Sequence, residues 1–287
     1  MPEQTKLSDE EAFRKLQLTE LDMLQAVGRF CDDNGLTWFL DGGTALGALR
    51  HRGFIPWDDD IDIGMPRDDF ERLISLAETK FPDGYSLHTL SNTAGYTPLF
   101  AKVYKNGTKN YTSATMNARC DQGIYVDIFP YDELSSDTKT RRKQVRNARI
   151  WQRIAFLYSQ TTMDMPHGGL LGLAEKIAFF VGHCVARLTL TQEKIRRHAE
   201  KSIDPHADSG ILLSFAWAEY EGFPREIVIP TAPQTFEGHV FPAPGRLDEY
   251  LTATYGNWEA LPPEDQRQTH MPQLLDFGDG SYWARES

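Results

Sequence analysis

The chain has 287 residues, of which 40% are hydrophobic and 25% charged, which is ordinary for a globular protein with one large core or two smaller ones. Its formal net charge of −11 argues against nucleic-acid binding, because that function needs a basic face that displaces counterions. Three widely spaced cysteines without a CxxC pair predict neither a disulfide framework nor a zinc site.

The amino-terminal part combines a charged first stretch with an amphipathic helix. The first residues, MPEQTKLSDEEAFRK, have no apolar core of a secretory signal, so we expect a cytoplasmic protein. A helix is predicted over residues 20–32, with Thr19 and Asp22 spaced as a capping box and Gly35 as its end. Its apolar stripe is typical of a helix that packs on a core.

A glycine pair follows the next predicted strand, residues 36–40. Gly42, Gly43 and Thr44 precede a short predicted helix, and such a strand, turn and helix start form an anion pocket. A glycine pair alone usually marks only a tight turn, and neither a Walker loop nor a dinucleotide fingerprint is present. Arg50 and the two basic residues after it add positive charge that suits phosphate, although a solvated surface is the common alternative.

Four carboxylates then fall within five residues, in the sequence DDDID. If this stretch is a strand, Asp58, Asp60 and Asp62 share one face, with alternate residues about 6.5–7 Å apart. Three crowded anions without a neighbouring lysine or arginine repel one another, so a divalent cation is the natural counter-charge. The pattern therefore predicts a site for Mg²⁺, or Mn²⁺, on these three aspartates.

Two other interpretations of the acidic run are a solvated loop and a calcium loop. Isoleucines interleave with the acids and give the segment one apolar face, which loops rarely show. A calcium loop needs glycine at its sixth position and glutamate at its twelfth, where this chain has Ile63 and Asp69. We therefore favour the strand.

Further along, a helix is predicted over residues 68–81 and strands over 85–90 and 99–105. A longer strand, GIYVDIFPYDE, places Asp127 on the face opposite its aliphatic residues. A lone aspartate in so apolar a strand is costly unless it is paired or metal-bound. A cap at the strand end is one explanation, and a third active-site carboxylate is the one we favour.

The middle of the chain, residues 135–209, is helical in character. Its basic stretch 139–149 is typical of a solvated helix face. Charged residues interrupt the apolar run 170–190, which predicts a buried or interfacial helix instead of a spanning one, and a peripheral contact with the inner face of a membrane or a lipid-linked acceptor. Beyond it we expect hairpin strands over 226–230 and 235–241 and a helix over 247–255.

Three stretches together resemble the LicD family, which includes the fukutin-related proteins: FLDGGTALGALRHRGFIPWDDDIDIGMPRDDFERL, YVDIFPYDEL and the ending FEGHVFPAPGRLDEYLTATYGNWEALPPEDQRQTH. The resemblance covers most of the chain except the extreme amino terminus and residues 135–209. It implies an α/β (α+β) fold of the nucleotidyltransferase (polymerase-β-like) type, with a mixed sheet flanked by helices. Residues 1–134 would form the catalytic core, 135–209 a helical insertion, and 210–287 the part that completes the catalytic domain.

The resemblance also implies an activity: transfer of a phospho-alcohol, typically phosphocholine, from a CDP-linked donor to a hydroxyl of a cell-surface glycan or teichoic-acid-like precursor, with CMP leaving. The donor phosphate would contact Gly42, Gly43, Thr44 and Arg50, the metal would be held by Asp58, Asp60 and Asp62, and Asp60, Asp62 and Asp127 would be catalytic, Asp127 as general base.

Two alternatives to this activity remain open. A nucleotidyltransferase shares the fold and the acids but moves a nucleoside monophosphate from a triphosphate to a small acceptor and releases pyrophosphate. A non-catalytic module would bind a glycan and keep the acids only as vestiges, which the presence of all four aspartates argues against.

Overall fold

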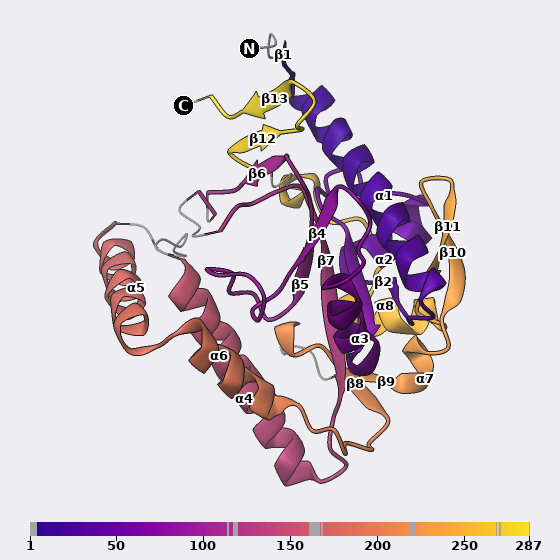
Figure 1. The fold of residues 1–287 in the computed structure, drawn as a ribbon, viewed down its shortest axis with the longest axis vertical. Coiled ribbons are helices and arrows are strands. Elements are labelled where there is room, and N and C mark those ends of the chain that lie inside the picture. Colours follow the sequence, from indigo (N-terminus) through magenta and orange to yellow (C-terminus); the bar gives the residue numbers. More distant parts are fainter. Residues whose placement is uncertain are drawn as a thin grey trace.

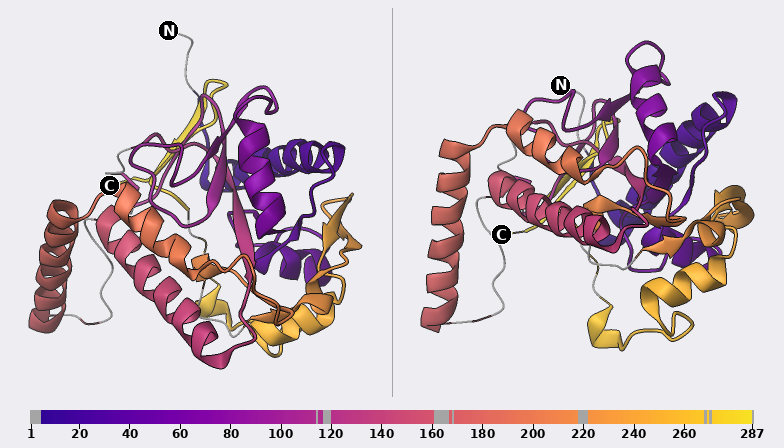
Figure 2. Two further views of the ribbon diagram at one scale, coloured as in Figure 1. Left: turned by 60° about the horizontal axis from the view of Figure 1, so that its bottom comes forward. Right: turned by 90° about the horizontal axis from the view of Figure 1, so that it is seen from below.

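The computed structural model describes residues 5–113, 115–116, 120–160, 167, 169–217, 222–267, 269 and 271–286. A mixed sheet occupies the middle of the molecule, and the helices of the amino-terminal part lie on the opposite side from α4, α5 and α6 (Figures 1 and 2). This mixed architecture of strands and helices confirms the predicted α/β fold class.

The central sheet has the strand order β2-β3-β7-β5-β4, and β8 and β9 extend it from β7. Its strands are β2 (Phe39–Leu40), β3 (Asp62–Pro66), β4 (Tyr85–His88), β5 (Ala101–Lys105), β7 (Tyr125–Glu133), β8 (Ile211–Leu213) and β9 (Phe223–Pro224). Strands β3 and β7 are parallel and their register pairs Asp62 with Asp127. Two predicted site residues far apart in sequence thereby become neighbours.

Helix α1 (Asp9–Asp33) is longer than the predicted helix, because its true start carries a stronger cap. The Ser8 hydroxyl accepts the backbone N–H of Glu11, and the Glu11 carboxylate accepts the backbone N–H of Ser8. The predicted capping box at Thr19 is wrong, since the Thr19 hydroxyl instead donates to the carbonyl of Lys15 inside the helix. The first turns of α1 are rich in charged residues, so the spacing of apolar residues did not reveal that the helix begins there.

The remaining helices outside residues 135–209 are α2 (Gly42–His51), α3 (Arg67–Ala77), α7 (Arg225–Val228) and α8 (Leu247–Tyr255). The predicted strand over 226–230 is wrong, because α7 occupies most of it. The hairpin consists of β10 (Ala232–Phe236) and β11 (His239–Ala243), so the predicted strand over 235–241 crosses its turn. A smaller sheet, in the order β1-β13-β12-β6, joins the two ends of the described chain. Its strands are β1 (Thr5–Lys6), β6 (Lys109–Tyr111), β12 (Leu274–Asp276) and β13 (Ser281–Ala284).

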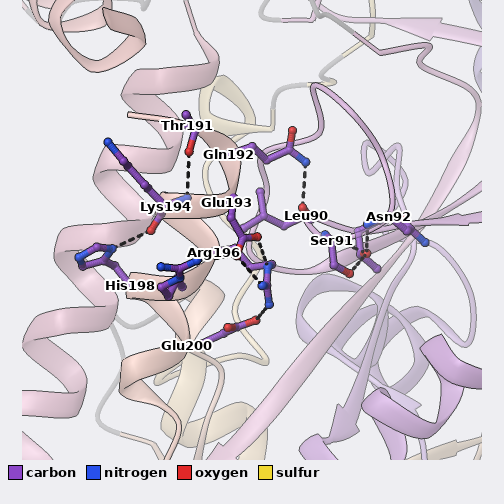
Figure 3. Close-up of polar contacts among 12 residues, drawn as sticks. Leu90, Ser91, Asn92, Thr191, Gln192, Glu193, Lys194, Arg196, His198 and Glu200 are labelled. Carbon is purple, nitrogen blue, oxygen red and sulfur yellow. Dashed lines mark hydrogen bonds and ion pairs between the residues drawn. The ribbon is translucent and has the colours of Figure 1, made fainter. Parts of the chain in front are cut away.

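The middle of the chain forms α4 (Thr138–Ser159), α5 (Gly169–Thr189) and α6 (Gln192–Ala199), which ends in a 3-10 turn (Glu200–Ser202). Helix α6 is tied to the loop after β4, because the Gln192 amide donates to the carbonyls of Leu90 at 2.8 Å and Thr93 at 2.7 Å; Figure 3 shows the bond to Leu90. Helix α5 is the outermost element of this group in every view (Figures 1 and 2). Within the described residues, none of the helices has the length and apolarity needed to cross a membrane.

Candidate active site

The glycine pair forms the first turn of α2 and not a separate loop. Gly42 has φ +49°, and a Cβ built there would lie 3.3 Å from Asp62 Oδ2. A Cβ on Gly43 would lie only 2.8 Å from Asp58 Oδ2. Two carboxylates therefore lie directly against the helix N-terminus, where a side chain would displace them. The backbone N–H groups of such a terminus favour an anion, so a phosphate group and a counter-cation suit this place together.

The acidic run is mostly a loop. Strand β3 begins only at Asp62, so the predicted alternation of Asp58 and Asp60 along a strand is wrong. Burial and repulsion from Asp60 and Asp59 raise the pKa of Asp58 to about 8. Burial, Asp60 and Asp127 raise the pKa of Asp62 well above its usual range. Both shifts mean that the cluster resists full ionisation, and the predicted cation site stays a prediction.

Asp127 lies in β7 beside a positive partner that the sequence did not indicate. The Lys102 ammonium on β5 donates to both Asp127 oxygens, at 2.6 and 2.9 Å, and lies 3.3 Å from the centre of the Tyr125 ring. Burial raises the pKa of Asp127 to about 6 although Lys102 lowers it. The carboxylate is thus mostly ionised at neutral pH and remains able to take a proton.

Glu20 on α1 is a further acid of this cluster that the sequence analysis missed. Its side chain is fully buried, and neither carboxylate oxygen has a hydrogen-bond partner among the described residues. Burial raises its pKa well above the usual range, and repulsion from Asp60, Asp59, Asp127 and Asp58 adds to this shift. A charged residue inside an apolar helix stripe was the available signal. An unpartnered buried carboxylate next to four aspartates is an energetic cost that a bound cation would relieve.

Asp41 is the N-cap of α2, and its carboxylate fixes the start of the helix through hydrogen bonds. It accepts the backbone N–H of Gly42 at 2.9 Å and hydrogen bonds from the hydroxyls of Tyr131 and Tyr250. Burial raises its pKa, which these hydrogen bonds oppose. Thr44, predicted to contact the donor phosphate, is buried, and its hydroxyl accepts the backbone N–H of Asp62 at 2.9 Å. Both residues hold the glycine turn against β3.

Arg50 lies at the other end of α2. Its guanidinium donates to the carbonyls of Trp258 at 2.9 Å and Ala260 at 3.4 Å, and to the His51 ring at 3.0 Å. Burial lowers the pKa of Arg50. In this structure Arg50 ties the carboxy-terminal segment to α2, so its predicted contact with donor phosphate stays a prediction.

Two cavities lie next to this cluster of acids. A cavity of about 210 Å³ is lined by Asp41, Gly42 and Asp62, with aromatic residues of β7 and α8 behind them. A second, of about 890 Å³, lies between α4, α5 and β5 and contains Lys102 in its wall. Trp217 lines both. The glycine turn lines the smaller cavity, and Lys102, which contacts Asp127, lines the larger one, so each cavity could take one substrate.

The carboxylates are suitable ligands for a divalent cation, but in this structure they do not form a complete coordination sphere. No group of three or more His, Cys, Asp or Glu side chains in the described part of the chain is arranged to hold an ion. Mg²⁺ usually keeps several waters and needs only one or two carboxylates besides substrate phosphates. The unpartnered Glu20 and the raised pKa values of Asp58 and Asp62 indicate missing positive charge. A cation that arrives with a phosphate-bearing donor agrees with both findings.

Comparison with known proteins gives a consistent set of relatives. Residues 35–165 match a family model described as LicD/FKTN/FKRP, nucleotidyltransferase domain. The chain is 28% identical over 267 residues to lipopolysaccharide cholinephosphotransferase LicD of Haemophilus influenzae, over 91% of this chain and 96% of that protein. It is 35% identical over 178 residues to an uncharacterized protein of Rickettsia prowazekii, over 56% of this chain and 67% of that protein. It is also 49% identical to human ribitol 5-phosphate transferase FKRP over 35 residues, 12% of this chain and 7% of that protein.

Proposed function

This chain belongs to the LicD family, and from that membership we propose that it is a phosphotransferase that moves a phospho-alcohol from a CDP-linked donor to a glycan hydroxyl, with CMP leaving. Phosphocholine is the first candidate for the transferred group, because the relative that aligns over nearly its whole length is a cholinephosphotransferase. The FKRP relative transfers ribitol 5-phosphate, which makes that group the second candidate.

Two cavities that share Trp217 carry the proposal: Asp62 lines the smaller one, and Lys102, which is bonded to the Asp127 carboxylate, lines the larger one. The donor diphosphate would lie at the N-terminus of α2, against Gly42 and Gly43. The acceptor would enter the larger cavity, whose wall contains Lys102, Arg153 and Arg187 and no acidic side chain of the described residues. Parallel pairing of β3 and β7 places Asp62 of the first cavity next to Asp127, which contacts the wall of the second.

In the reaction, the acceptor oxygen bonds to the phosphorus of the phospho-alcohol while the bond from that phosphorus to the CMP oxygen breaks. The hydroxyl proton passes to Asp127, which Lys102 keeps ionised and in place. Asp58, Asp60 and Asp62 would hold Mg²⁺ or Mn²⁺, with Glu20 beside them. Such a cation neutralises charge on the donor diphosphate and on the leaving group.

The test is a thermal-shift panel followed by product analysis. CDP-choline, CDP-ribitol, CDP-glycerol, CTP and UTP, each with Mg²⁺, are compared, because a ligand at about 100 times its Kd stabilises a protein by about 2.7 kcal/mol. We expect a CDP-alcohol to give the largest shift and CMP to appear when an acceptor is added. Pyrophosphate released from CTP would establish a nucleotidyltransferase instead. Binding of glycan without nucleotide or turnover would indicate a non-catalytic module.

The cytoplasmic location predicted from the sequence stays a prediction, and it is checked by fractionation of cells that produce the tagged protein. A fraction that pellets with membranes and is released by salt would place the protein at the membrane surface.

A further inference from the structure

Helix α5 exposes an apolar half to solvent. Seven of its large apolar side chains are between 53% and 86% exposed: Leu171, Leu173, Ile177, Phe180, Val181, Val185 and Leu188. At 100° per residue they all fall on one half of the helix surface, and no charged residue falls among them. Monomeric soluble proteins rarely expose a continuous apolar surface of this kind, which usually marks an interaction site.

The opposite half of α5 is held by α4. Phe179 packs against Phe156, with ring centres 6.2 Å apart, and the His183 ring is hydrogen-bonded to the carbonyl of Leu157 at 2.9 Å. The Arg187 guanidinium lies 4.2 Å from the centre of the Tyr158 ring. Among the described residues, these contacts anchor the helix through the side that faces α4. Helix α5 lies at the edge of the molecule (Figure 2), and its exposed apolar residues belong to none of the core clusters of the described residues.

The helices around this apolar surface are the basic part of an acidic protein. Residues 138–199 contain twelve lysines and arginines and three acidic residues, whereas the whole chain has a net charge of −11. The arginines of α4 line a hollow of about 600 Å³ on its surface: Arg141, Arg142, Arg146, Arg149 and Arg153. Arg196 of α6 is ion-paired with Glu193 and Glu200 (Figure 3), so the excess positive charge comes mainly from α4.

We propose that the α4–α6 unit docks on an anionic lipid bilayer, with α5 lying along the surface and its apolar half in the interfacial region. An amphipathic helix with basic neighbours binds a membrane in this way, through apolar burial and attraction to anionic lipid. A second copy of the chain is a poorer occupant, because pairing of this face with itself would bring two strongly basic units together.

This inference rests on the proposed function and names the acceptor as a glycan carried on a lipid. Phe156, Phe179, His183 and Arg187, which join α5 to α4, also line the 890 Å³ cavity that reaches Lys102. A lipid-linked glycan held in the bilayer under α5 would therefore have its sugar next to the mouth of the cavity. Docking of α5 would thereby bring the acceptor sugar to the cavity that is lined by Lys102, the partner of Asp127.

The experiment is flotation of the full chain with vesicles, without donor or acceptor. Vesicles of phosphatidylglycerol and phosphatidylcholine in equal parts are compared with pure phosphatidylcholine, at low and high salt. We expect flotation with the anionic vesicles at low salt and release at high salt, because the attraction of surface charges is screened. The double variant Ile177→Asn/Val181→Asn should bind at least about tenfold more weakly, since two large side chains no longer enter the apolar layer.

The matched control is Val240→Asn on β11, which changes a still more exposed valine at the far side of the molecule and should float like the wild type. Absence of flotation, or flotation that the double variant leaves unchanged, would overturn the proposal. A concentration-dependent dimer in sedimentation velocity that the double variant abolishes, without vesicle binding, would assign the surface to self-association.

Failure of this inference and failure of the proposed function give different results. Flotation needs no catalysis, so a protein that floats and transfers nothing contradicts only the transferase assignment. The double variant should keep wild-type rates on a water-soluble acceptor fragment and lose rate only on an acceptor embedded in vesicles. Wild-type rates on both acceptors would contradict the docking role of α5 alone.

Discussion

At the scale of single residues, the aspartates of the DDDID run should matter for turnover and not for folding. We expect Asp60→Asn and Asp62→Asn to abolish transfer and to leave the fold intact or more heat-resistant in metal-free buffer, because each removes one of several repelling charges. Transfer assays at saturating Mg²⁺ and thermal melts in EDTA measure the two effects. Asp68→Asn, on the exposed first turn of α3, is the control. Near-normal turnover in either variant would remove that aspartate from the site.

Glu20 allows a separate test of the cation site. Glu20→Gln keeps the shape of the side chain but removes an acid that is fully buried beside four aspartates. The metal-free variant should melt higher, by about 2–4 °C per kcal/mol gained, and should bind Mn²⁺ about 10–100-fold more weakly. Calorimetric titration with Mn²⁺ measures the affinity without any need for turnover.

The control for Glu20 is Glu10→Gln on the same helix, which changes an exposed acid and should leave both quantities unchanged. Unaltered Mn²⁺ affinity in Glu20→Gln would show that Glu20 is only a buried acid of α1 and takes no part in the site.

Asp127 can act as base or as metal ligand, and one substitution separates the roles. As a base, Asp127→Asn should lower kcat by about 10²–10⁴-fold and leave donor and Mg²⁺ affinity almost unchanged, because the lost interaction belongs to the transition state. As a ligand, the same variant should weaken Mg²⁺ binding and recover activity in excess metal. Activity measured over a Mg²⁺ titration decides between them, and substantial rescue would make Asp127 a ligand. The same Mg²⁺ titration of the activity of Lys102→Met tests the ion-pair partner of Asp127.

At the scale of elements, the start of α2 is set by its two glycines. Gly43→Ala should keep the fold, because alanine suits a helix and the new Cβ meets only the movable end of the Asp58 side chain, at 2.8 Å. It should reduce transfer by displacing that carboxylate from the turn. In Gly64→Ala the new Cβ would lie 2.4 Å from the Phe39 ring inside the core, so that variant should lose stability instead.

Melting temperature and transfer rate of the two glycine variants check this contrast. A Gly43→Ala protein with unchanged rate would show that the approach of Asp58 to the helix start is not needed for transfer.

At the scale of the whole molecule, stability without metal should depend on pH in an unusual direction. The folded pKa of Asp58, about 8, is above that of an unfolded aspartate, about 3.9, so the native state binds more protons between these values. This contribution to stability is fully present below about pH 4 and is lost as the pH rises toward 8. Melting temperatures in EDTA should therefore fall over this window.

The comparison that isolates this effect is wild type against Asp58→Asn, which should show a flatter pH dependence. Mg²⁺ with a bound donor should raise the melting temperature most near pH 8, where the carboxylates are ionised. Equal slopes for the two proteins in EDTA would contradict the buried, repelled state of Asp58.

The sequence by itself determined the elements whose pattern is local. The predicted helix over 247–255 matches α8 at its observed bounds, and the alternation around VDIF predicted β7 with Asp127 in it. The DGGT and DDDID runs predicted a candidate site whose members lie close together, because residues close in sequence must lie close in space. Local patterns failed at the start of α1 and in the loop before Asp62. There the residues are mostly charged, so the spacing of apolar residues did not indicate the backbone conformation.

Only the tertiary structure decided which distant groups complete the site. Lys102 meets Asp127 across paired strands, and Tyr131 and Tyr250 reach Asp41 from 90 and 209 residues away. Glu20 becomes a member of the acid cluster because α1 packs beside the loop of Asp58, where Gln17 donates to the Asp58 carbonyl. Such pairs leave no periodic trace in a sequence, since the free energy that places them comes from burial of whole elements against the sheet and not from any local preference.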